Sequence, residues 1–289
     1  MKNKICLITG ASSGIGKITA IELAKMGANV SIICRSQVQA EYVCTDIRKL
    51  SKSKAVDYFV ADLGCLESVK QLIENVKNRL DRIDVLINNA GLFYKERHET
   101  HDKIESHWQV NYLSHFFLTN SLIDILKKSE SARIINVSSE GHRWSDIDFK
   151  DLVIKKKYNG LKAYGRSKLA QIYFTYELAE ILKGSNVTVN ALHPGFVSTN
   201  IGRDNGIILK LIKIFGIFFS ITPEKGAETS IYLASSNRVE NVTGKYFFKN
   251  MPIRSSMISY NREIGKHLWK ISWRQLEDKG FLNINNISS

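Results

Sequence analysis

A tyrosine and a lysine four residues apart, Tyr164 and Lys168, are the pair in this sequence whose types and spacing best suit chemistry. This spacing puts both side chains on one face of a predicted helix. A free phenol titrates near pH ~10, and a fixed ammonium beside it favours the phenolate, which suits proton transfer. Most such pairs are only neighbours on a helix surface, so the assignment depends on the rest of the chain.

A glycine-rich segment follows the first apolar run. It reads Thr9-Gly10-Ala11-Ser12-Ser13-Gly14-Ile15-Gly16 and joins a predicted strand, Lys4–Thr9, to a predicted helix, Gly14–Met26. Glycines permit a tight turn and a close approach of the backbone to a pyrophosphate. The helix N-terminus adds N–H donors and a positive dipole. The segment predicts a dinucleotide site, although a glycine cluster alone is often only a turn.

Arg35 and Ser36 follow the second predicted strand. An acidic residue about 20 positions beyond the glycines would bind the ribose hydroxyls of NAD. A guanidinium and a hydroxyl instead suit the extra phosphate of NADP, which an aspartate would repel. We therefore expect NADP(H) in preference to NAD(H), and the alternative is an ordinary solvated arginine at a strand end.

Short Val/Ile-rich runs alternate with helical patterns along the chain. The predicted strands are Lys4–Thr9, Asn29–Cys34, Ala55–Val60, Ile83–Asn88, Ala132–Val137 and Asn186–Leu192. The predicted helices are Gly14–Met26, Leu66–Leu80, Lys103–Lys127 and Lys162–Lys183. This alternation predicts an α/β fold, a doubly wound parallel sheet of the Rossmann type, whose ligands bind beyond the carboxyl ends of the strands.

Five ordered motifs make the chain resemble the short-chain dehydrogenase/reductase family over about residues 4–248. They are the glycine segment, Asn88-Asn89-Ala90-Gly91, Ser139, the Tyr164 and Lys168 pair, and Pro194-Gly195 followed by Thr199. The resemblance implies one domain over residues 1–289, with a substrate lid at about 200–222 and a C-terminal helix and tail at about 256–289.

The resemblance also implies a catalytic tetrad. Tyr164 would exchange a proton with the substrate oxygen, which Ser139 would steady, and Ser138 would be structural. Lys168 would lower the Tyr164 pKa and hold the nicotinamide ribose. Asn111 would anchor a proton relay, and its alternative is a buried asparagine that bends a helix.

The coenzyme would contact residues from most of these motifs, with Asp62 near the adenine. The implied set is Thr9, Gly10, Ser12, Ser13, Gly14, Ile15, Gly16, Arg35, Ser36, Asp62, Leu63, Asn89, Ala90, Gly91, Tyr164, Lys168, Pro194, Gly195, Val197 and Thr199.

Within the family, the chain resembles the retinol dehydrogenase branch. Ser139 and Tyr164 stand 25 positions apart, with the extra residues centred on Asp146–Asn159. The runs Arg133–Ser139 and Thr222–Ala227 also match the branch, whereas Gly165-Arg166 and Glu140-Gly141 depart from it. We also expect no N-terminal hydrophobic anchor of the kind that the branch carries.

An apolar segment, Ile207–Ile221, falls where the family places its substrate loop. It is shorter than the ~20 residues that span a bilayer. Lys210 and Lys213 can share one helical face, which leaves apolar residues to cover a pocket or lie on a membrane surface. The alternative is a packed helix or a homodimer contact. The functional reading predicts a lipophilic carbonyl or alcohol, such as a retinoid, a steroid or a lipid aldehyde.

Two rival functions stay open. One is an NADP(H)-binding regulatory or scaffold protein without turnover, which a damaged tetrad would indicate, yet all four residues are present. The other is a soluble carbonyl reductase of small xenobiotics, which would need a more polar lid than Ile207–Ile221.

The bulk composition limits partners and compartment. A net charge of +13 could favour nucleic acid, but the basic residues are dispersed and their longest run is Lys155-Lys156-Lys157, which suits a solvated loop. The first apolar run, Ile5–Ile8, is too short for a signal peptide. We expect a cytoplasmic protein, or one peripheral on an intracellular membrane, and not a secreted one.

Metal binding is not expected. The four cysteines, Cys6, Cys34, Cys44 and Cys65, have no metal-ligand pairing, which also favours a reducing compartment. His98, His101 and His107 cluster loosely but include no fourth ligand.

Overall fold

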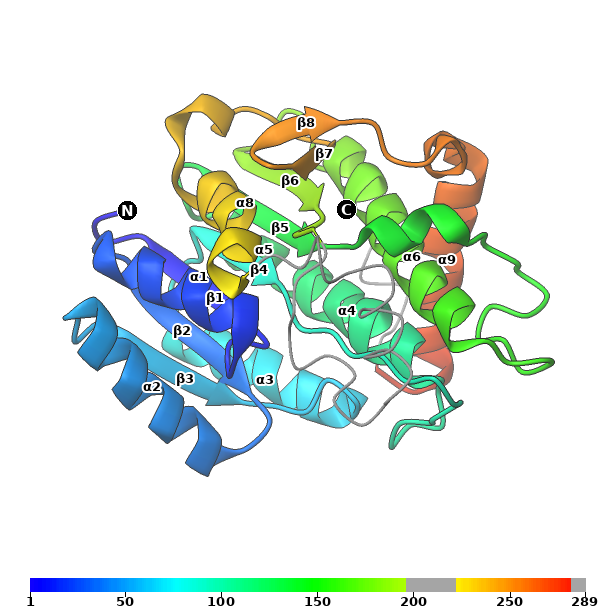
Figure 1. Cartoon of the computed structure of the whole chain (residues 1–289), viewed down its shortest axis with the longest axis horizontal. Coiled ribbons are helices and arrows are strands. Elements are labelled where there is room, and N and C mark those ends of the chain that lie inside the picture. The colour runs from blue at the N-terminus through cyan, green and yellow to red at the C-terminus, as the bar shows by residue number, and fades with distance from the viewer. Residues whose placement is uncertain (196–221, 282–289) are drawn as a thin grey trace.

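A mostly parallel sheet of eight strands forms the centre of the computed structural model (Figure 1), which describes residues 1–195 and 222–281. Its order is β3-β2-β1-β4-β5-β6-β7-β8. The strands are β1 (Ile5–Thr9), β2 (Asn29–Cys34), β3 (Val56–Val60), β4 (Val85–Asn88), β5 (Ala132–Val137), β6 (Val187–Leu192), β7 (Lys245–Phe248) and β8 (Met251–Ile253). The predicted doubly wound parallel sheet is confirmed, with one addition: β8 pairs antiparallel with β7.

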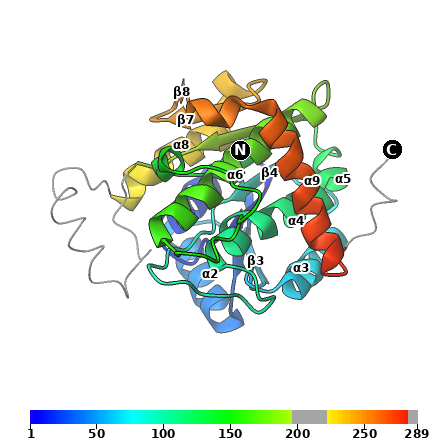
Figure 2. The same cartoon turned by 90° about the vertical axis from the view of Figure 1, so that its right-hand side faces the viewer.

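Helices cover both faces of the sheet (Figures 1 and 2). On one face, α1 (Gly14–Lys25) packs against α2 (Gln37–Ser51) and α8 (Pro223–Ser235). On the other face lie α3 (Leu66–Arg79), α4 (Ser114–Ser121) and α6 (Gly160–Ile181), and α9 (Arg262–Asp278) packs against α6. Shorter helical segments complete this set: the π-helix η1 (His107–Leu113), α5 (Ile123–Leu126), and the 3₁₀ helices η2 (Glu140–Trp144), η3 (Asn237–Val239) and η4 (Met257–Tyr260).

The helical segment predicted over roughly Lys103–Lys127 is present from residue 106 to residue 126 but is divided into several pieces. The chain there forms the π-helix η1, then α4 and α5, which are separated at Leu122. A π-helix widens the turn, and such turns occur often at functional sites. Periodicity could not show the break because apolar residues continue through it.

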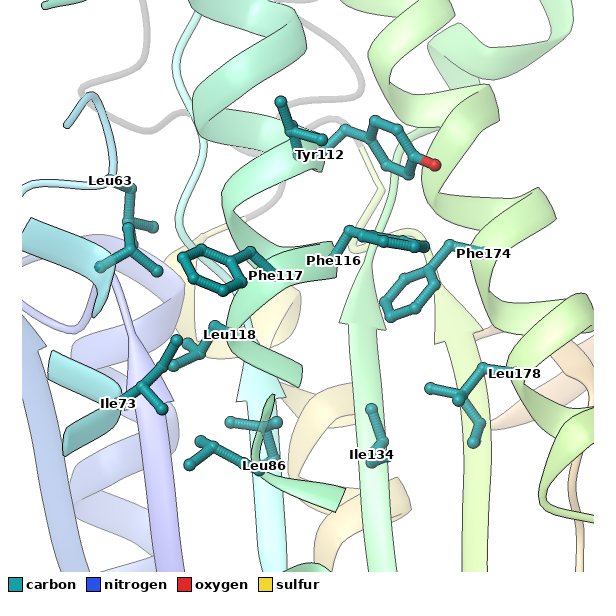
Figure 3. Close-up of a cluster of buried hydrophobic side chains, with 14 of the residues drawn as sticks. Leu63, Ile73, Leu86, Tyr112, Phe116, Phe117, Leu118, Ile134, Phe174 and Leu178 are labelled. Atoms are coloured by element: carbon teal, nitrogen blue, oxygen red, sulfur yellow. The ribbon is translucent and has the colours of Figure 1, made fainter. Parts of the chain in front are cut away.

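An aromatic core fills the space between the sheet and α4 and α6 (Figure 3). The Phe116 ring lies 5.2 Å from that of Phe174 and 4.9 Å from that of Trp269, centroid to centroid. Since Trp269 belongs to α9, the C-terminal helix is part of this core. Aromatic pairs at these distances add about 0.5–1.5 kcal/mol beyond area burial.

The strand order reverses between β1 and β4, which are neighbours in the sheet. In open α/β sheets, the crevice for ligands lies at such a point, outside the carboxyl ends of the strands. Thr9 and Asn88 are the last residues of these strands. Within residues 1–195 and 222–281, none of the helices has the length and apolarity needed to span a bilayer.

Candidate active site

The glycine segment packs directly on the chain that follows β4. Gly10 has a φ of +65°, and a Cβ there would stand 2.6 Å from the Ala90 Cα. A Cβ at Gly16 would stand 2.5 Å from Asn89 Nδ2. No side chain larger than that of glycine fits at these short distances. Close packing, and not turn propensity alone, therefore requires glycine at both positions.

Thr9 links the glycine segment to the chain that follows β4. Its buried hydroxyl oxygen accepts hydrogen bonds from the backbone N–H groups of Asn89 and Ala90, each at 2.9 Å. His115 Nε2 lies 2.9 Å from the same oxygen. Thr9 was expected to contact the coenzyme, and the structure gives it a supporting position under the loop.

A cavity of about 420 Å³ opens above the carboxyl ends of the strands. It joins the glycine segment to the Tyr164 and Lys168 pair. The residues that line it are Gly10, Ser12, Ser13, Gly14, Ile15, Gly16, Ile33, Cys34, Arg35, Ala61, Asp62, Leu63, Asn89, Ala90, Gly91, Leu92, Phe93, Tyr94, Val110, Val137, Ser138, Tyr164, Lys168 and Pro194.

Arg35 lies at one end of this cavity, directly after β2, and Ser36, which follows it, is not among the lining residues. Arg35 is exposed and lines the cavity. The Ser36 hydroxyl caps α2 by accepting a hydrogen bond from the Gln39 N–H at 3.3 Å. Asp62 lines the cavity too, and its carboxylate accepts from the Gly64 N–H at 2.8 Å, which orients it.

Lys168 reaches the cavity from α6 and is 3% exposed. Its ammonium donates to the Val137 carbonyl at 2.9 Å and to Gln171 Oε1 at 3.0 Å. Gln171 did not figure among the expected site residues, although its position three residues after Lys168 puts it within reach on the same helix. A Cβ built at Gly91 would stand 3.4 Å from the Lys168 Nζ, so the amine faces the floor of the cavity.

Tyr164 and Ser139 meet over Gly141. A Cβ at Gly141 would stand 3.3 Å from Tyr164 Cε1 and 3.5 Å from Ser139 Oγ. The Lys168 Nζ lies 5.8 Å from the centroid of the Tyr164 ring. The structure thus brings together three of the four tetrad side chains that the family resemblance implies.

Burial dominates the titration of this pair. It lowers the pKa of Lys168 to about 7. It also raises the pKa of Tyr164, and a hydrogen bond with Ser139 opposes that rise. The expected lowering of the Tyr164 pKa by Lys168 is therefore not found here, because the amine points at Val137 and Gln171. The phenol is held in its protonated form at neutral pH.

Asn111 lies in the π-helix η1 and is completely buried. Its side chain accepts from the Leu92 N–H at 2.8 Å and donates to the Leu92 carbonyl at 3.1 Å. Nδ2 also donates to Ser167 Oγ at 3.0 Å, and a Cβ at Gly91 would stand 3.5 Å from Oδ1. Asn111 therefore joins α6 to the cavity floor, close to Lys168.

Ser138 and Ser139 have different partners. The Ser138 hydroxyl donates to the Lys168 carbonyl at 2.8 Å, a structural contact. The backbone of Ser139 is held by His142, whose Nδ1 lies 2.7 Å from the Ser139 carbonyl and whose Nε2 accepts from the Ser256 N–H at 2.9 Å. His142 lacked any motif signal, because its second partner is distant in sequence.

After β6, the first described range of residues ends at Gly195, within the predicted site. Pro194 lines the cavity, and Gly195 has a φ of +86°. Val197, Thr199 and the segment Ile207–Ile221 lie outside the described residues.

Comparisons with known proteins agree with this geometry. A family model described as short chain dehydrogenase matches residues 4–206. The chain belongs to the short-chain dehydrogenase family. Like other members, this short-chain dehydrogenase is an oxidoreductase of a family that uses NAD(H) or NADP(H).

The relatives of this short-chain dehydrogenase include human retinol dehydrogenase 14, which is 42% identical over 94% of this chain and 86% of its own length. Human polyprenol dehydrogenase is 35% identical over 93% of this chain and 84% of its own. A crystal structure of an uncharacterized protein from Mycobacterium paratuberculosis has a TM-score of 0.77 at 30% identity, covering 94% of this chain and 93% of that one.

The described residues fit a dinucleotide. Ser12, Ser13 and Gly14 line the cavity at the start of α1, where a helix N-terminus can bind a pyrophosphate. The cavity then continues from Arg35 to Lys168, over the length of the crevice. Among the residues described, no group of three histidine, cysteine or acidic side chains could hold a metal ion.

Proposed function

We propose that the protein interconverts a lipophilic carbonyl compound and its alcohol by hydride transfer, with NADP(H) as coenzyme and Tyr164 as general acid/base. The observation that carries the proposal is that Tyr164 and Lys168 line the same cavity as the glycine segment and Arg35. A proton donor and a dinucleotide cradle are thereby placed in one continuous space.

The protein's part in the reaction is alignment and proton transfer. A bound nicotinamide would supply the hydride. Tyr164, protonated at neutral pH, gives its proton to the carbonyl oxygen, and the Ser139 hydroxyl donates a hydrogen bond to the same oxygen. Lys168, which lines the same cavity, would bind the nicotinamide ribose. General acid catalysis of this sort contributes about 10²–10⁴-fold.

NADP(H) rather than NAD(H) is proposed from Arg35. Arg35 is exposed and follows β2 directly at the cavity, where its guanidinium can bind a 2′-phosphate. Charge-assisted hydrogen bonds of this kind contribute about 1.5–3 kcal/mol. Asp62 and Leu63, which line the same end, would contact the adenine.

A lipophilic substrate is proposed from the relatives, which are named for retinol and polyprenol. The apolar run Ile207–Ile221 supports it, since its composition suits a cover for a lipid-like molecule. Action on such molecules suits a protein of the cytoplasm or of the surface of an intracellular membrane.

The test is to mix the purified protein with NADPH or NADH and all-trans-retinal, a polyprenal or a steroid ketone, and to follow coenzyme absorbance. Tyr164→Phe removes the proton donor, and Tyr42→Phe, on the exposed face of α2, removes a phenol elsewhere. We expect turnover with NADPH in the wild type and Tyr42→Phe, and a loss of at least ~10²-fold in Tyr164→Phe.

Each other outcome has a definite meaning. If retinal is inert but another lipid carbonyl reacts, the retinoid expectation fails and the mechanism stands. If NADPH binds and no carbonyl or alcohol reacts, the protein is a coenzyme-binding regulator. Faster turnover with NADH would contradict the role of Arg35.

A further inference from the structure

Three side chains outside the tetrad meet beside Tyr164. His107 is fully buried in η1, and its Nδ1 lies 2.6 Å from Glu105 Oε1. The Tyr158 hydroxyl donates to the same carboxylate oxygen at 2.9 Å and lies 3.1 Å from Nδ1. Glu105 is 2% exposed, so this is a desolvated polar cluster rather than a surface ion pair.

One backbone contact decides the tautomer of His107. The Tyr94 N–H donates to His107 Nε2 at 2.9 Å. An amide N–H can only donate, so Nε2 must carry the lone pair and Nδ1 must carry the proton. That proton points at Glu105, which as a carboxylate can only accept.

The other hydrogen bonds of the Glu105 carboxylate also come from donor groups. Its oxygens accept from the backbone N–H groups of His107 at 3.1 Å and Trp108 at 2.8 Å, at the start of η1. Burial raises the pKa of Glu105, but the hydrogen bonds from His107 and these amides outweigh it and hold the pKa below its ordinary value. The carboxylate is therefore ionised and fixes the ring.

The other face of the ring is turned toward the site. The His107 ring lies 6.1 Å from that of Tyr164, edge to face. The Phe93 ring packs against both of them, 5.5 Å from His107 and 5.6 Å from Tyr164, so the three rings contact one another in a triangle. Phe93 and Tyr94 line the cavity beside Tyr164. Because His107 contacts both of these residues, it fixes the part of the cavity wall that packs on the Tyr164 phenol.

We propose that Glu105 and His107 are positioning residues of this active site. Glu105 selects the Nδ1–H tautomer, and His107 in that tautomer holds the Phe93 and Tyr94 segment against the Tyr164 ring. The effect on turnover rests on the proposed function, whereas the tautomer and the held segment do not.

Glu105→Gln is the decisive variant because it keeps the shape of the side chain. If the amide oxygen faces His107, the NH₂ group opposes the Trp108 N–H. If the NH₂ group faces Nδ1, the ring must adopt the Nε2–H tautomer, and that proton opposes the Tyr94 N–H. Either arrangement breaks a buried hydrogen bond.

Three measurements test the proposal on the full chain. Ring ¹⁵N chemical shifts give the His107 tautomer, amide exchange reports the Trp108 and Tyr94 N–H groups, and steady-state kinetics with NADPH and a reactive carbonyl report turnover. In Glu105→Gln we expect amide exchange at least ~10-fold faster at Trp108 if His107 keeps the Nδ1–H tautomer, and at Tyr94 if the ring changes to the Nε2–H tautomer. We also expect kcat to fall by up to about 10²-fold, with coenzyme affinity unchanged, because only the Phe93 and Tyr94 segment that packs on the Tyr164 ring moves.

Two variants control the experiment. His98→Ala removes an exposed ring that packs on Tyr94 at 4.4 Å without a hydrogen bond to its amide, and we expect kcat and Tyr94 exchange to stay at wild-type values. Tyr158→Phe removes one donor to Glu105 but leaves the tautomer, so its effect should be smaller than that of Glu105→Gln.

Several results would overturn the proposal. An Nε2–H tautomer in the wild type removes its basis, and so does unchanged exchange of both the Trp108 and the Tyr94 amides in Glu105→Gln. A loss of kcat that only follows a loss of folded protein or of coenzyme affinity reduces the cluster to a stabilising role. If the wild type turns over no carbonyl, the proposed function fails, while the shifts and exchange rates still decide whether the segment is held as described.

Discussion

Replacing Lys168 by methionine should change how stability depends on pH. The wild-type amine is 3% exposed, and burial lowers its pKa from 10.5 to about 7. In the unfolded chain the same amine has its ordinary pKa. Between pH 7 and 10.5 the unfolded state therefore binds more protons than the folded state, and the free energy of unfolding rises with pH.

The size of this effect follows from the shift. At about 1.4 kcal/mol for each pKa unit, the wild type should gain on the order of 3–4 kcal/mol relative to Lys168→Met between pH 7 and 10. The variant also leaves the Val137 carbonyl and Gln171 Oε1 without their donor, which costs about 1–3 kcal/mol. That cost does not depend on pH. The titration of Lys168 is therefore measured by how the difference in free energy of unfolding between the two proteins changes with pH.

Urea unfolding of the coenzyme-free protein at pH 7, 8, 9 and 10, followed by tryptophan fluorescence, measures the slope. Lys49→Met, on the exposed side of α2, controls for removal of a lysine. It should run parallel to the wild type. A constant difference between Lys168→Met and the wild type across this range would show that the amine keeps its ordinary pKa, and the reasoning from burial would be refuted.

Four more substitutions have definite expected outcomes. Gly10→Ala puts a Cβ 2.6 Å from backbone at a positive φ, whereas Gly184→Ala has a positive φ with nothing within 4 Å, so Gly184→Ala should lose ~1–2 kcal/mol in urea unfolding, and Gly10→Ala should lose more than that and should also lose coenzyme affinity by titration. Arg35→Asp should lower NADPH affinity at least ~10-fold while NADH affinity holds, and equal losses of both would contradict phosphate binding. His142→Phe should lower kcat more than coenzyme affinity, because it frees the Ser139 carbonyl that His142 holds at 2.7 Å; an unchanged kcat would remove that role.

The sheet could be read from the sequence because its signals are local. The run Ala132–Val137 is apolar enough for a strand buried on both faces, and β5 has those bounds. The strands β7 and β8 were not anticipated. They lie at the sheet edge, are three to four residues long, and show little contrast with the loops beside them.

Only those site residues that belong to a sequence motif could be predicted from the sequence. The glycine segment and the Tyr164 and Lys168 pair lie on the cavity as expected. Burial, which sets the titration of both side chains, depends on packing that no short motif records. The partners Gln171 and His142 were missed for the same reason, since each acts through a contact formed only in the folded chain.

The docking of α9 has a consequence for the order in which the chain can become active. Trp108 Nε1 donates to Gln275 at 3.0 Å, and the Tyr112 hydroxyl lies 2.6 Å from Ser272 Oγ, so both ends of η1 are bound to α9. During synthesis, the coenzyme-binding strands leave the ribosome long before α9 does. We expect a nascent chain to acquire a dinucleotide cradle first and an ordered Asn111 later, so that competence for proton transfer appears only after α9 has been synthesised.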